Sequence, residues 1–306
     1  MDALQDASVL VTGGTGFIGS RLVPRLRAAG ARITVLTRDP ARARRRLGDA
    51  VQYLERPEEA ASVAPRFLVN LAGEGIADRP WTEARRRALL DSRVALTETL
   101  AGALAAAPPE VVVSASAVGY YGTSETATFT EADPVGEGFA AELCRQWEEA
   151  ALRFEAVGSR LTRLRIGLVL GPGGLLARLR LPFQFGLGGR IGHGRQWMSW
   201  VHLEDVLGLL EFTLATPASA GVLNATAPEP ATNAEFTRAL GRVLHRPTPF
   251  PVPAFVLRAA LGDLADELLL EGARVLPSRP LELGYRFRQP ELERALADAL
   301  DRPLPG

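Results

Sequence analysis

Three glycines near the N-terminus have the spacing of a phosphate-binding turn. Gly13, Gly16 and Gly19 form a G-x-x-G-x-x-G pattern between a short β-branched run at 9–12 and a helical pattern. In a strand–turn–helix context, residues without side chains let the backbone approach a pyrophosphate, and the helix N-terminus stabilises its charge. The pattern therefore predicts a dinucleotide site, with a glycine turn that binds no ligand as the alternative.

The residues after the second predicted strand indicate which dinucleotide binds. This strand, at 32–37, ends in Thr37 and is followed by Arg38, Asp39 and an arginine-rich run at 42–46. A carboxylate at the strand end suits the ribose 2′-hydroxyl of NAD, whereas a guanidinium suits the 2′-phosphate of NADP. We expect most of the arginine run to be a solvated helix face and Arg38 to bind the phosphate, which favours NADP(H).

Few side chains in this chain could move protons near neutral pH. Every basic residue is arginine, which excludes Schiff-base lysines, lysine general bases and the lysine of phosphate-binding loops. The chain has four tyrosines, three scattered histidines and the single Cys144, so no metal-ligand spacing is present and we predict no metal. A lone cysteine forms no internal disulfide, which fits a reducing compartment.

Alternating strand and helix patterns predict the scaffold that positions these residues. Apolar strands are expected at 9–12, 32–37, 66–71, 111–114 and 161–170, with helices at 17–29, 82–107 and 142–157. Short, continuously apolar strands separated by amphipathic helices are typical of a parallel sheet covered on both faces. The fold class predicted is α/β, a Rossmann-type doubly wound sheet with a smaller C-terminal α+β lobe.

The amino-acid composition of the sequence changes after residue 171. The segment 171–200 is rich in glycine and is expected to be a loop that crosses between lobes, and the tail has frequent prolines. We expect 1–171 to form the NADP-binding domain, with 198–220 returning to it. The remaining segments, 172–197 and 221–306, are expected to form the smaller substrate-binding lobe.

Charge and hydropathy limit the partners. The 306 residues include 35 basic and 35 acidic side chains, so no charge surplus attracts nucleic acid or an anionic membrane. No uncharged apolar run approaches the ~18 residues of a membrane span, and no signal pattern starts the chain. We therefore expect a cytoplasmic monomer or homodimer that acts on a small molecule.

Ten motifs occur in the order found in a known family. They are V-T-G-G-T-G-F-I-G (11–19), N-L-A-G-E (70–74), W-T-E-A-R (81–85), D-S-R-V (91–94), S-A-S-A-V-G-Y-Y-G (114–122), L-C-R-Q-W-E (143–148), L-G-P-G-G (170–174), G-H-G-R-Q (192–196), W-V-H-L-E-D (200–205) and L-E-G-A-R-V-L-P (270–277). Over nearly its whole length the chain resembles the extended short-chain dehydrogenase/reductases. Within that branch it resembles the atypical NAD(P)-dependent epimerase/dehydratase-family proteins that have a C-terminal domain of unknown function.

The resemblance implies cofactor contacts from the ends of the central strands. It places 70–73 on the adenine and ribose side, 114–116 beside the nicotinamide ribose and 166–168 over the nicotinamide. Arg93 either holds Glu74 or a phosphate, or makes an ion pair on a helix surface. The expected cofactor-binding residues are Gly13, Thr15, Gly16, Phe17, Ile18, Gly19, Thr37, Arg38, Asn70, Leu71, Ala72, Gly73, Glu74, Arg93, Ser114, Ala115, Ile166, Gly167 and Leu168.

The chain departs from the superfamily at its catalytic signature. Where that superfamily has the tyrosine and lysine of Y-x-x-x-K, this sequence has Phe139 and Leu143. A chain without lysine cannot lower a tyrosine pKa with a neighbouring ammonium group, so the usual proton relay is absent.

Three hydroxyls near the expected nicotinamide are the replacement candidates: Ser116, Tyr120 and Tyr121. Either phenol could hydrogen-bond a substrate oxygen, although an unassisted phenol, with a pKa near ~10, is an acid rather than a base. Tyr121 is favoured because its neighbour Gly122 aligns with the tyrosine–glycine pair of extended members; a purely aromatic wall is the alternative. Further cleft candidates are Glu74, Arg79, Gln196, Trp200 and His202.

These features favour an NADP(H)-dependent oxidoreductase or epimerase that acts on a small or nucleotide-linked carbonyl or alcohol. The alternative is a non-catalytic NADP(H)-binding protein with a regulatory or scaffold role. The missing tyrosine–lysine pair favours the alternative, and the retained G-Y-Y-G and 192–196 motifs favour the enzyme.

Overall fold

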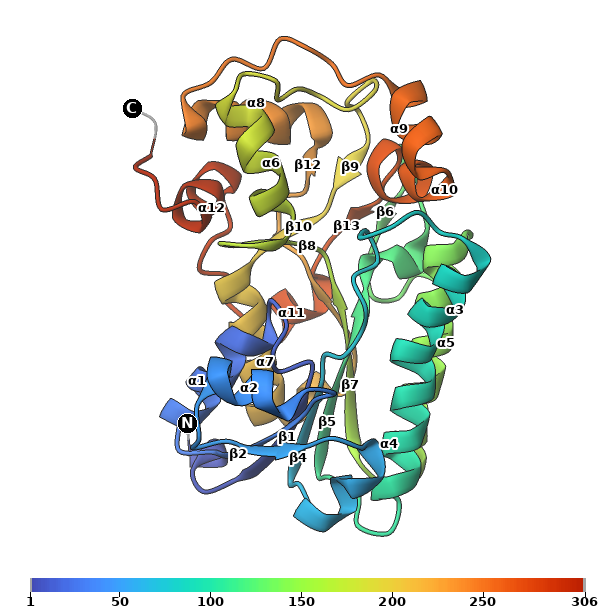
Figure 1. Cartoon of the computed structure of the whole chain (residues 1–306), viewed down its shortest axis with the longest axis vertical. Coiled ribbons are helices and arrows are strands. Elements are labelled where there is room, and N and C mark those ends of the chain that lie inside the picture. Colours follow the sequence, from blue (N-terminus) through green and yellow to red (C-terminus); the bar gives the residue numbers. More distant parts are fainter. Residues whose placement is uncertain (1, 305–306) are drawn as a thin grey trace.

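A seven-stranded, entirely parallel sheet forms the centre of the structure, a computed structural model that describes residues 2–304 (Figure 1). Its strand order is β11-β7-β5-β4-β1-β2-β3. The order reverses between β1 and β4, as in a doubly wound dinucleotide-binding fold. The predicted α/β fold class is therefore confirmed.

The elements follow one another with short connections. The strands are β1 (Ser8–Thr12), β2 (Arg32–Leu36), β3 (Gln52–Leu54), β4 (Phe67–Asn70), β5 (Val111–Ala117), β6 (Thr128–Phe129), β7 (Arg160–Ile166), β8 (Leu168–Leu170), β9 (Trp197–Met198), β10 (Trp200–His202), β11 (Gly221–Ala225), β12 (Ala231–Thr232) and β13 (Arg274–Val275). The helices are α1 (Gly19–Ala28), α2 (Pro40–Leu47), α3 (Glu83–Leu90), α4 (Leu96–Leu104), α5 (Phe139–Ala156), α6 (Gly174–Gln184), α7 (Leu203–Ala215), α8 (Asn233–Leu244), α9 (Ala254–Leu261), α10 (Asp263–Ala265), α11 (Ser278–Glu282) and α12 (Leu292–Ala299). Within residues 2–304, no helix has the length and hydropathy needed to cross a membrane.

The middle of strand β1 is apolar on both sides because both faces of the sheet are covered. Val9 and Val11 of β1 pack with α1 and α7 on one face. Leu10, between them, packs with α4 and α5 on the other face. Successive side chains of a strand point to opposite faces, so continuous apolar runs are the signature of this arrangement.

A second lobe lies beyond the carboxyl ends of the central strands, at the top of Figure 1. Its core is built from α6, α8 and α12 around Trp200, which is fully buried. Helix α8 begins with a capping box in which Thr232 and Glu235 satisfy each other's backbone N–H groups. The two lobes meet where β8 pairs with β10.

Two predicted boundaries are wrong. Strand β11 was expected in the second lobe, since we placed the division at residue 220, but it pairs with β7 at the edge of the central sheet. The segment 171–200 was expected to be a loop, but it contains α6. Pro182 lies in the last turn of this helix, where it removes one i→i−4 backbone hydrogen bond, and the helix ends two residues later at Gln184.

Two continuous patterns are interrupted in the structure. The strand predicted at 161–170 divides into β7 and β8 at Gly167, where an added Cβ would lie 2.3 Å from the carbonyl oxygen of Ser199. The helix predicted at 82–107 divides into α3 and α4 around a π-helical turn, Asp91–Ala95. Both interruptions occur beside the expected cofactor site.

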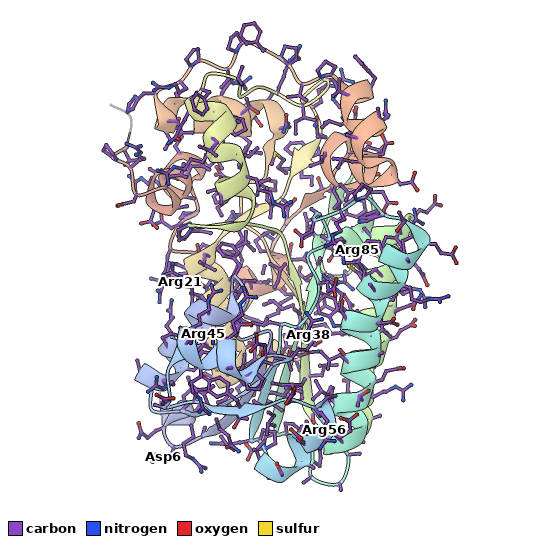
Figure 2. The ribbon with its side chains drawn as sticks, in the orientation of Figure 1. Asp6, Arg21, Arg38, Arg45, Arg56 and Arg85 are labelled. Carbon is purple, nitrogen blue, oxygen red and sulfur yellow. The ribbon has the colours of Figure 1, made fainter. Side chains whose placement is uncertain are left out.

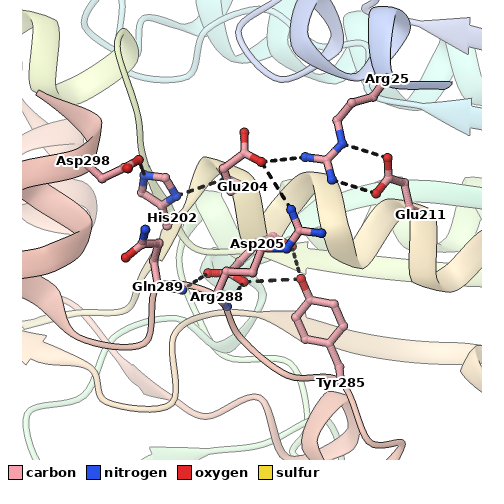
Figure 3. Close-up of polar contacts among 9 residues, drawn as sticks. All are labelled: Arg25, His202, Glu204, Asp205, Glu211, Tyr285, Arg288, Gln289 and Asp298. Atoms are coloured by element: carbon pink, nitrogen blue, oxygen red, sulfur yellow. Dashed lines mark hydrogen bonds and ion pairs between the residues drawn. The ribbon is translucent and has the colours of Figure 1, made fainter. Parts of the chain in front are cut away.

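A polar network centred on the buried Asp205 joins the C-terminal segment to the central domain (Figure 3). Asp205 of α7 is fully buried, and its carboxylate accepts hydrogen bonds from the backbone N–H groups of Arg288 (2.6 Å) and Gln289 (3.0 Å). On the same helix, Glu204 and Glu211 pair with Arg25 of α1 at 2.7 and 2.8 Å. These contacts fix α7 between the N-terminal domain and the tail.

His202 makes this network sensitive to acid. Its imidazole is buried, Nδ1 accepts a hydrogen bond from the backbone N–H of Glu204, and Nε2 lies 3.2 Å from Asp298. Burial lowers the pKa of His202 in spite of the charges of Asp298, Asp205 and Glu204, which raise it.

We expect wild-type stability to fall as the pH drops below about 6.5, because the unfolded state then binds a proton that folded His202 resists. His202→Asn replaces the Nδ1 acceptor of the helix cap with an amide oxygen and cannot titrate. Urea unfolding between pH 8 and pH 5 should give a steeper loss in wild type, by up to about 1.4 kcal/mol per pH unit. Equal slopes for the two proteins would exclude His202 as the origin.

Candidate functional site

The three glycines of the turn between β1 and α1 have different structural roles. Gly13 has φ +64°, and an added Cβ would lie 2.6 Å from the carbonyl oxygen of Leu71. A Cβ on Gly19 would lie 2.3 Å from the carbonyl oxygen of Gly13. At Gly16, in contrast, the nearest atom is that same oxygen at 3.1 Å, and the space beyond is open. Packing therefore requires glycine at 13 and 19, whereas Gly16 leaves room above the N-terminus of α1, which fits the demands of a bound pyrophosphate.

Phe17 connects this turn to the second lobe. Added Cβ atoms on Gly171 and Gly173 would each lie 2.9 Å from its ring, and Gly174 also faces it. The glycine-rich run before α6 is thus needed to accommodate an aromatic ring, and it brings the start of α6 to the predicted phosphate turn.

Arg38 lies two residues after the end of β2 and just before α2, and Figure 2 labels it together with Arg45 of α2 and Arg85 of α3. Its side chain is 90% exposed, and its guanidinium lies 3.6 Å from the carboxylate of Glu74. The other oxygen of Glu74 pairs with Arg85, and this hydrogen bond lowers the pKa of the Glu74 carboxyl. An exposed guanidinium at this strand end fits a 2′-phosphate.

Several expected cofactor residues turn inward and hold the loops in place. Asn70 is buried; its Oδ1 accepts a hydrogen bond from Thr12 (2.6 Å), and its Nδ2 donates to Thr97 (2.9 Å). Ser114 is also buried. Arg93 donates to the backbone carbonyl of Glu74 at 2.7 Å, so it holds the loop after β4 rather than forming a surface ion pair.

Ser116, at the carboxyl end of β5, is tied to a buried ion pair. Its hydroxyl donates a hydrogen bond to Glu148 of α5 at 2.8 Å. Arg165 of β7 grips the same carboxylate with Nε and Nη2, at 2.7 and 2.9 Å. Burial alone would lower the pKa of Arg165, but the hydrogen bonds and charge of Glu148 raise it above the ordinary value. Since the Ser116 proton points at Glu148, the serine oxygen is left as an acceptor.

The two phenols of the turn after β5 have different environments. Tyr121 is 2% exposed; its hydroxyl donates to Asn224 (2.7 Å) and accepts from Arg165 (2.9 Å). Burial raises the pKa of Tyr121 to about 12. Tyr120 is partly exposed and its ring stacks on the guanidinium of Arg165, 3.3 Å from the ring centroid. Within residues 2–304 the Tyr120 hydroxyl has no protein hydrogen-bond partner, so the structure favours Tyr120, and not Tyr121, as the phenol available to a substrate.

The residues at the usual tyrosine and lysine positions have become part of an apolar contact. Phe139 packs edge-on against Trp81, with ring centroids 4.9 Å apart, and Arg86 lies over its ring. Leu143 is buried in the same cluster, which also includes Leu264 of α10. These two positions therefore connect α3 and α5 to the second lobe and offer no proton-transfer group.

A pocket of about 370 Å³ opens between the segment after Tyr121 and the second lobe. Its polar lining comes from Thr123, Ser124, Glu125, His193, Arg258 and Glu271. A larger hollow, of about 650 Å³, lies at the amino ends of β1 and β2. Ligands of this fold bind at the carboxyl ends of the strands, which favours the smaller pocket as a ligand site, although its lining includes none of the candidate catalytic residues.

Some functional contacts were missed by sequence reasoning. Gln196, Trp200 and His202, expected at the cleft, are buried instead. Glu148, the partner of Ser116, was not predicted, and neither was Arg85, which pairs with Glu74 beside Arg38. The only available signal was that an arginine within a buried strand, such as Arg165, needs a carboxylate partner.

Two family models match this chain. A family model described as the NAD dependent epimerase/dehydratase family matches residues 9–225, which include the glycine turn, Ser116 and both tyrosines. The chain belongs to the NAD-dependent epimerase/dehydratase family. A second model, a domain of unknown function, matches residues 252–299, so the resemblance in the sequence is confirmed in both parts.

Relatives of this epimerase-family chain cover almost its whole length. Epimerase family protein Mb2239 of Mycobacterium bovis is 41% identical over 98% of this chain and 100% of its own length. The human epimerase family protein SDR39U1, crystallised with NADPH, aligns with a TM-score of 0.87 at 39% identity, covering 96% of this chain and 99% of that one. A structure described as a nucleoside-diphosphate sugar epimerase from Corynebacterium glutamicum has a TM-score of 0.80 at 28% identity, covering 98% of this chain and 60% of that one.

Proposed function

We propose that this epimerase-family chain is an NADP(H)-dependent oxidoreductase or epimerase that acts on a carbonyl or alcohol of a small or nucleotide-linked molecule. The open space at Gly16 and the exposed guanidinium of Arg38 after β2 are the main support for the cofactor. The presence of NADPH in the human relative supports the same assignment. When bound, NADP(H) supplies hydride chemistry.

The chain's own groups would then handle the substrate oxygen. The Ser116 oxygen accepts a hydrogen bond from a substrate hydroxyl, because its own proton is held by Glu148. The Tyr120 hydroxyl donates to a substrate carbonyl, and the adjacent Arg165 guanidinium stabilises negative charge that develops on the phenol. Tyr121 holds Arg165 in place. A small-molecule substrate and a monomeric or homodimeric state remain part of the proposal.

The test of this function is the oxidation of bound NADPH by a panel of carbonyl compounds that includes sugar nucleotides. Loss of NADPH that depends on a member of the panel supports the enzyme. If NADPH binds tightly but is not oxidised by any carbonyl, and protein loaded with NADP⁺ converts no alcohol or sugar nucleotide, the second candidate is supported. This candidate is a non-catalytic NADP(H)-binding protein, which the apolar packing of Phe139 and Leu143 favours.

Arg38 should determine the choice of cofactor. If its guanidinium binds the 2′-phosphate, NADPH binds at least about tenfold more tightly than NADH, a difference of about 1.4 kcal/mol. Arg38→Ala should remove most of this difference. Its matched control is Arg45→Ala, on the exposed face of α2, which should retain the preference. Equal affinities of the wild-type protein for the two dinucleotides, measured by calorimetry, would contradict the assignment.

A further inference from the structure

The loop after β4 is attached at several points above the phosphate turn. It starts at Leu71, whose carbonyl oxygen adjoins Gly13. Arg93 then holds the carbonyl of Glu74, and Arg85 donates to the carbonyl of Gly75 at 2.6 Å. The loop therefore leaves the turn as a fixed segment that extends toward the second lobe, as Figure 1 shows.

Helix α6 leaves the same turn from the other side. Its start is seated on the ring of Phe17, through Gly171, Gly173 and Gly174. One helical turn later, Arg178 extends to the loop: Nη1 donates to the carbonyl of Ala77 at 2.9 Å, and Nη2 pairs with the carboxylate of Asp78. The glycine turn, the loop, Arg178 and the start of α6 thus form a closed ring of contacts.

We propose that Arg178 and Asp78 form a strap that retains NADP(H) on the glycine turn, which makes Arg178 a positioning residue contributed by the second lobe. This inference rests on the proposed cofactor. A dinucleotide lying on the turn would be enclosed by the ring and could leave only after the strap opens. The side chains of Arg178 and Asp78 are 57% and 49% exposed, so the pair opens readily and the strap affects the rate of release.

The test is NADPH dissociation measured by stopped-flow fluorescence after mixing with excess NADP⁺. Arg178→Ala and Asp78→Ala should each release NADPH about threefold to tenfold faster than wild type. The first loses the ion pair and the hydrogen bond to Ala77, and the second loses the ion pair alone. The charge-swapped double variant, Asp78→Arg with Arg178→Asp, should return toward the wild-type rate. Arg180→Ala, an exposed arginine two residues further along α6, is the matched control and should not change the rate.

The strap proposal would be overturned if both single variants released NADPH at the wild-type rate. It would also be overturned if the charge-swapped double variant released NADPH as fast as the single variants. A wild-type protein that gives no NADPH signal would contradict the proposed function instead. In that case, hydrogen exchange of the backbone amides of residues 74–79 in the cofactor-free protein tests whether Arg178 holds the loop. Exchange should be faster in Arg178→Ala than in wild type or Arg180→Ala, and equal exchange in all three would overturn it.

Discussion

Gly16→Val abolishes NADPH binding, with an affinity loss of at least about 100-fold, while the protein still unfolds in one cooperative transition. The added methyl groups enter the open space above the N-terminus of α1, which the pyrophosphate needs, and they meet only the carbonyl oxygen of Gly13 at 3.1 Å from the Cβ. The same change at Gly19 would place a Cβ 2.3 Å from that oxygen and damage the fold itself. Calorimetric titration with NADPH, together with thermal unfolding, measures both outcomes.

Gly102→Val is the matched control for this prediction. Gly102 lies in α4, and nothing lies within 4 Å of an added Cβ there. The Gly102→Val protein should bind NADPH with wild-type affinity. Wild-type affinity in Gly16→Val would mean that the phosphates bind elsewhere on the protein.

Tyr120→Phe and Ser116→Ala should each lower turnover by about 100-fold or more once a substrate is found, with NADPH affinity unchanged. Removal of one group that hydrogen-bonds a developing oxyanion, or that orients the substrate for hydride transfer, typically has an effect of this size. Tyr121→Phe is the comparison, since it removes the same hydroxyl from the neighbouring residue. It should mainly lower the free energy of unfolding, by about 1–3 kcal/mol, because Arg165 and Asn224 lose a buried partner.

Steady-state turnover and urea unfolding separate these roles. If Tyr120→Phe retained full turnover, and Tyr121→Phe lost turnover at wild-type stability, Tyr121 would be the phenol that acts on the substrate. If all three variants retain full activity, the assignment of the catalytic site to these hydroxyls is wrong.

The order of strands and helices could be predicted from sequence because most of the central strands contain a short apolar run and are separated by helical patterns. The place of β11 could not be predicted in this way. Gly221–Ala225 is a short strand that follows the crossing to the second lobe, and pattern alone does not show when the chain returns to the central sheet. The break at Gly167 was equally hidden, because its cause is the approach of Ser199, a residue distant in sequence.

The candidate site likewise has parts that could be predicted from sequence and parts that could not. The turn at Gly13–Gly16 and the guanidinium of Arg38 are local features, so their spacing was informative. The choice between Tyr120 and Tyr121 depends on which way each side chain points from a 3₁₀ turn, and motif alignment cannot resolve this. The Ser116–Glu148 contact joins a strand to a helix, so it could be found only once both were placed in space.

The most direct test of the central claim, that this chain performs NADP(H)-dependent redox chemistry, is the fate of the reacting hydrogen. The protein would be loaded with NADPH deuterated at C4 of the nicotinamide and mixed with the carbonyl panel, and the products would be analysed by mass spectrometry. The account predicts an alcohol with deuterium on the former carbonyl carbon in wild type, and at least about 100-fold less of it with Tyr120→Phe. Bound NADPH that remains fully deuterated and unoxidised with every member of the panel would contradict the claim.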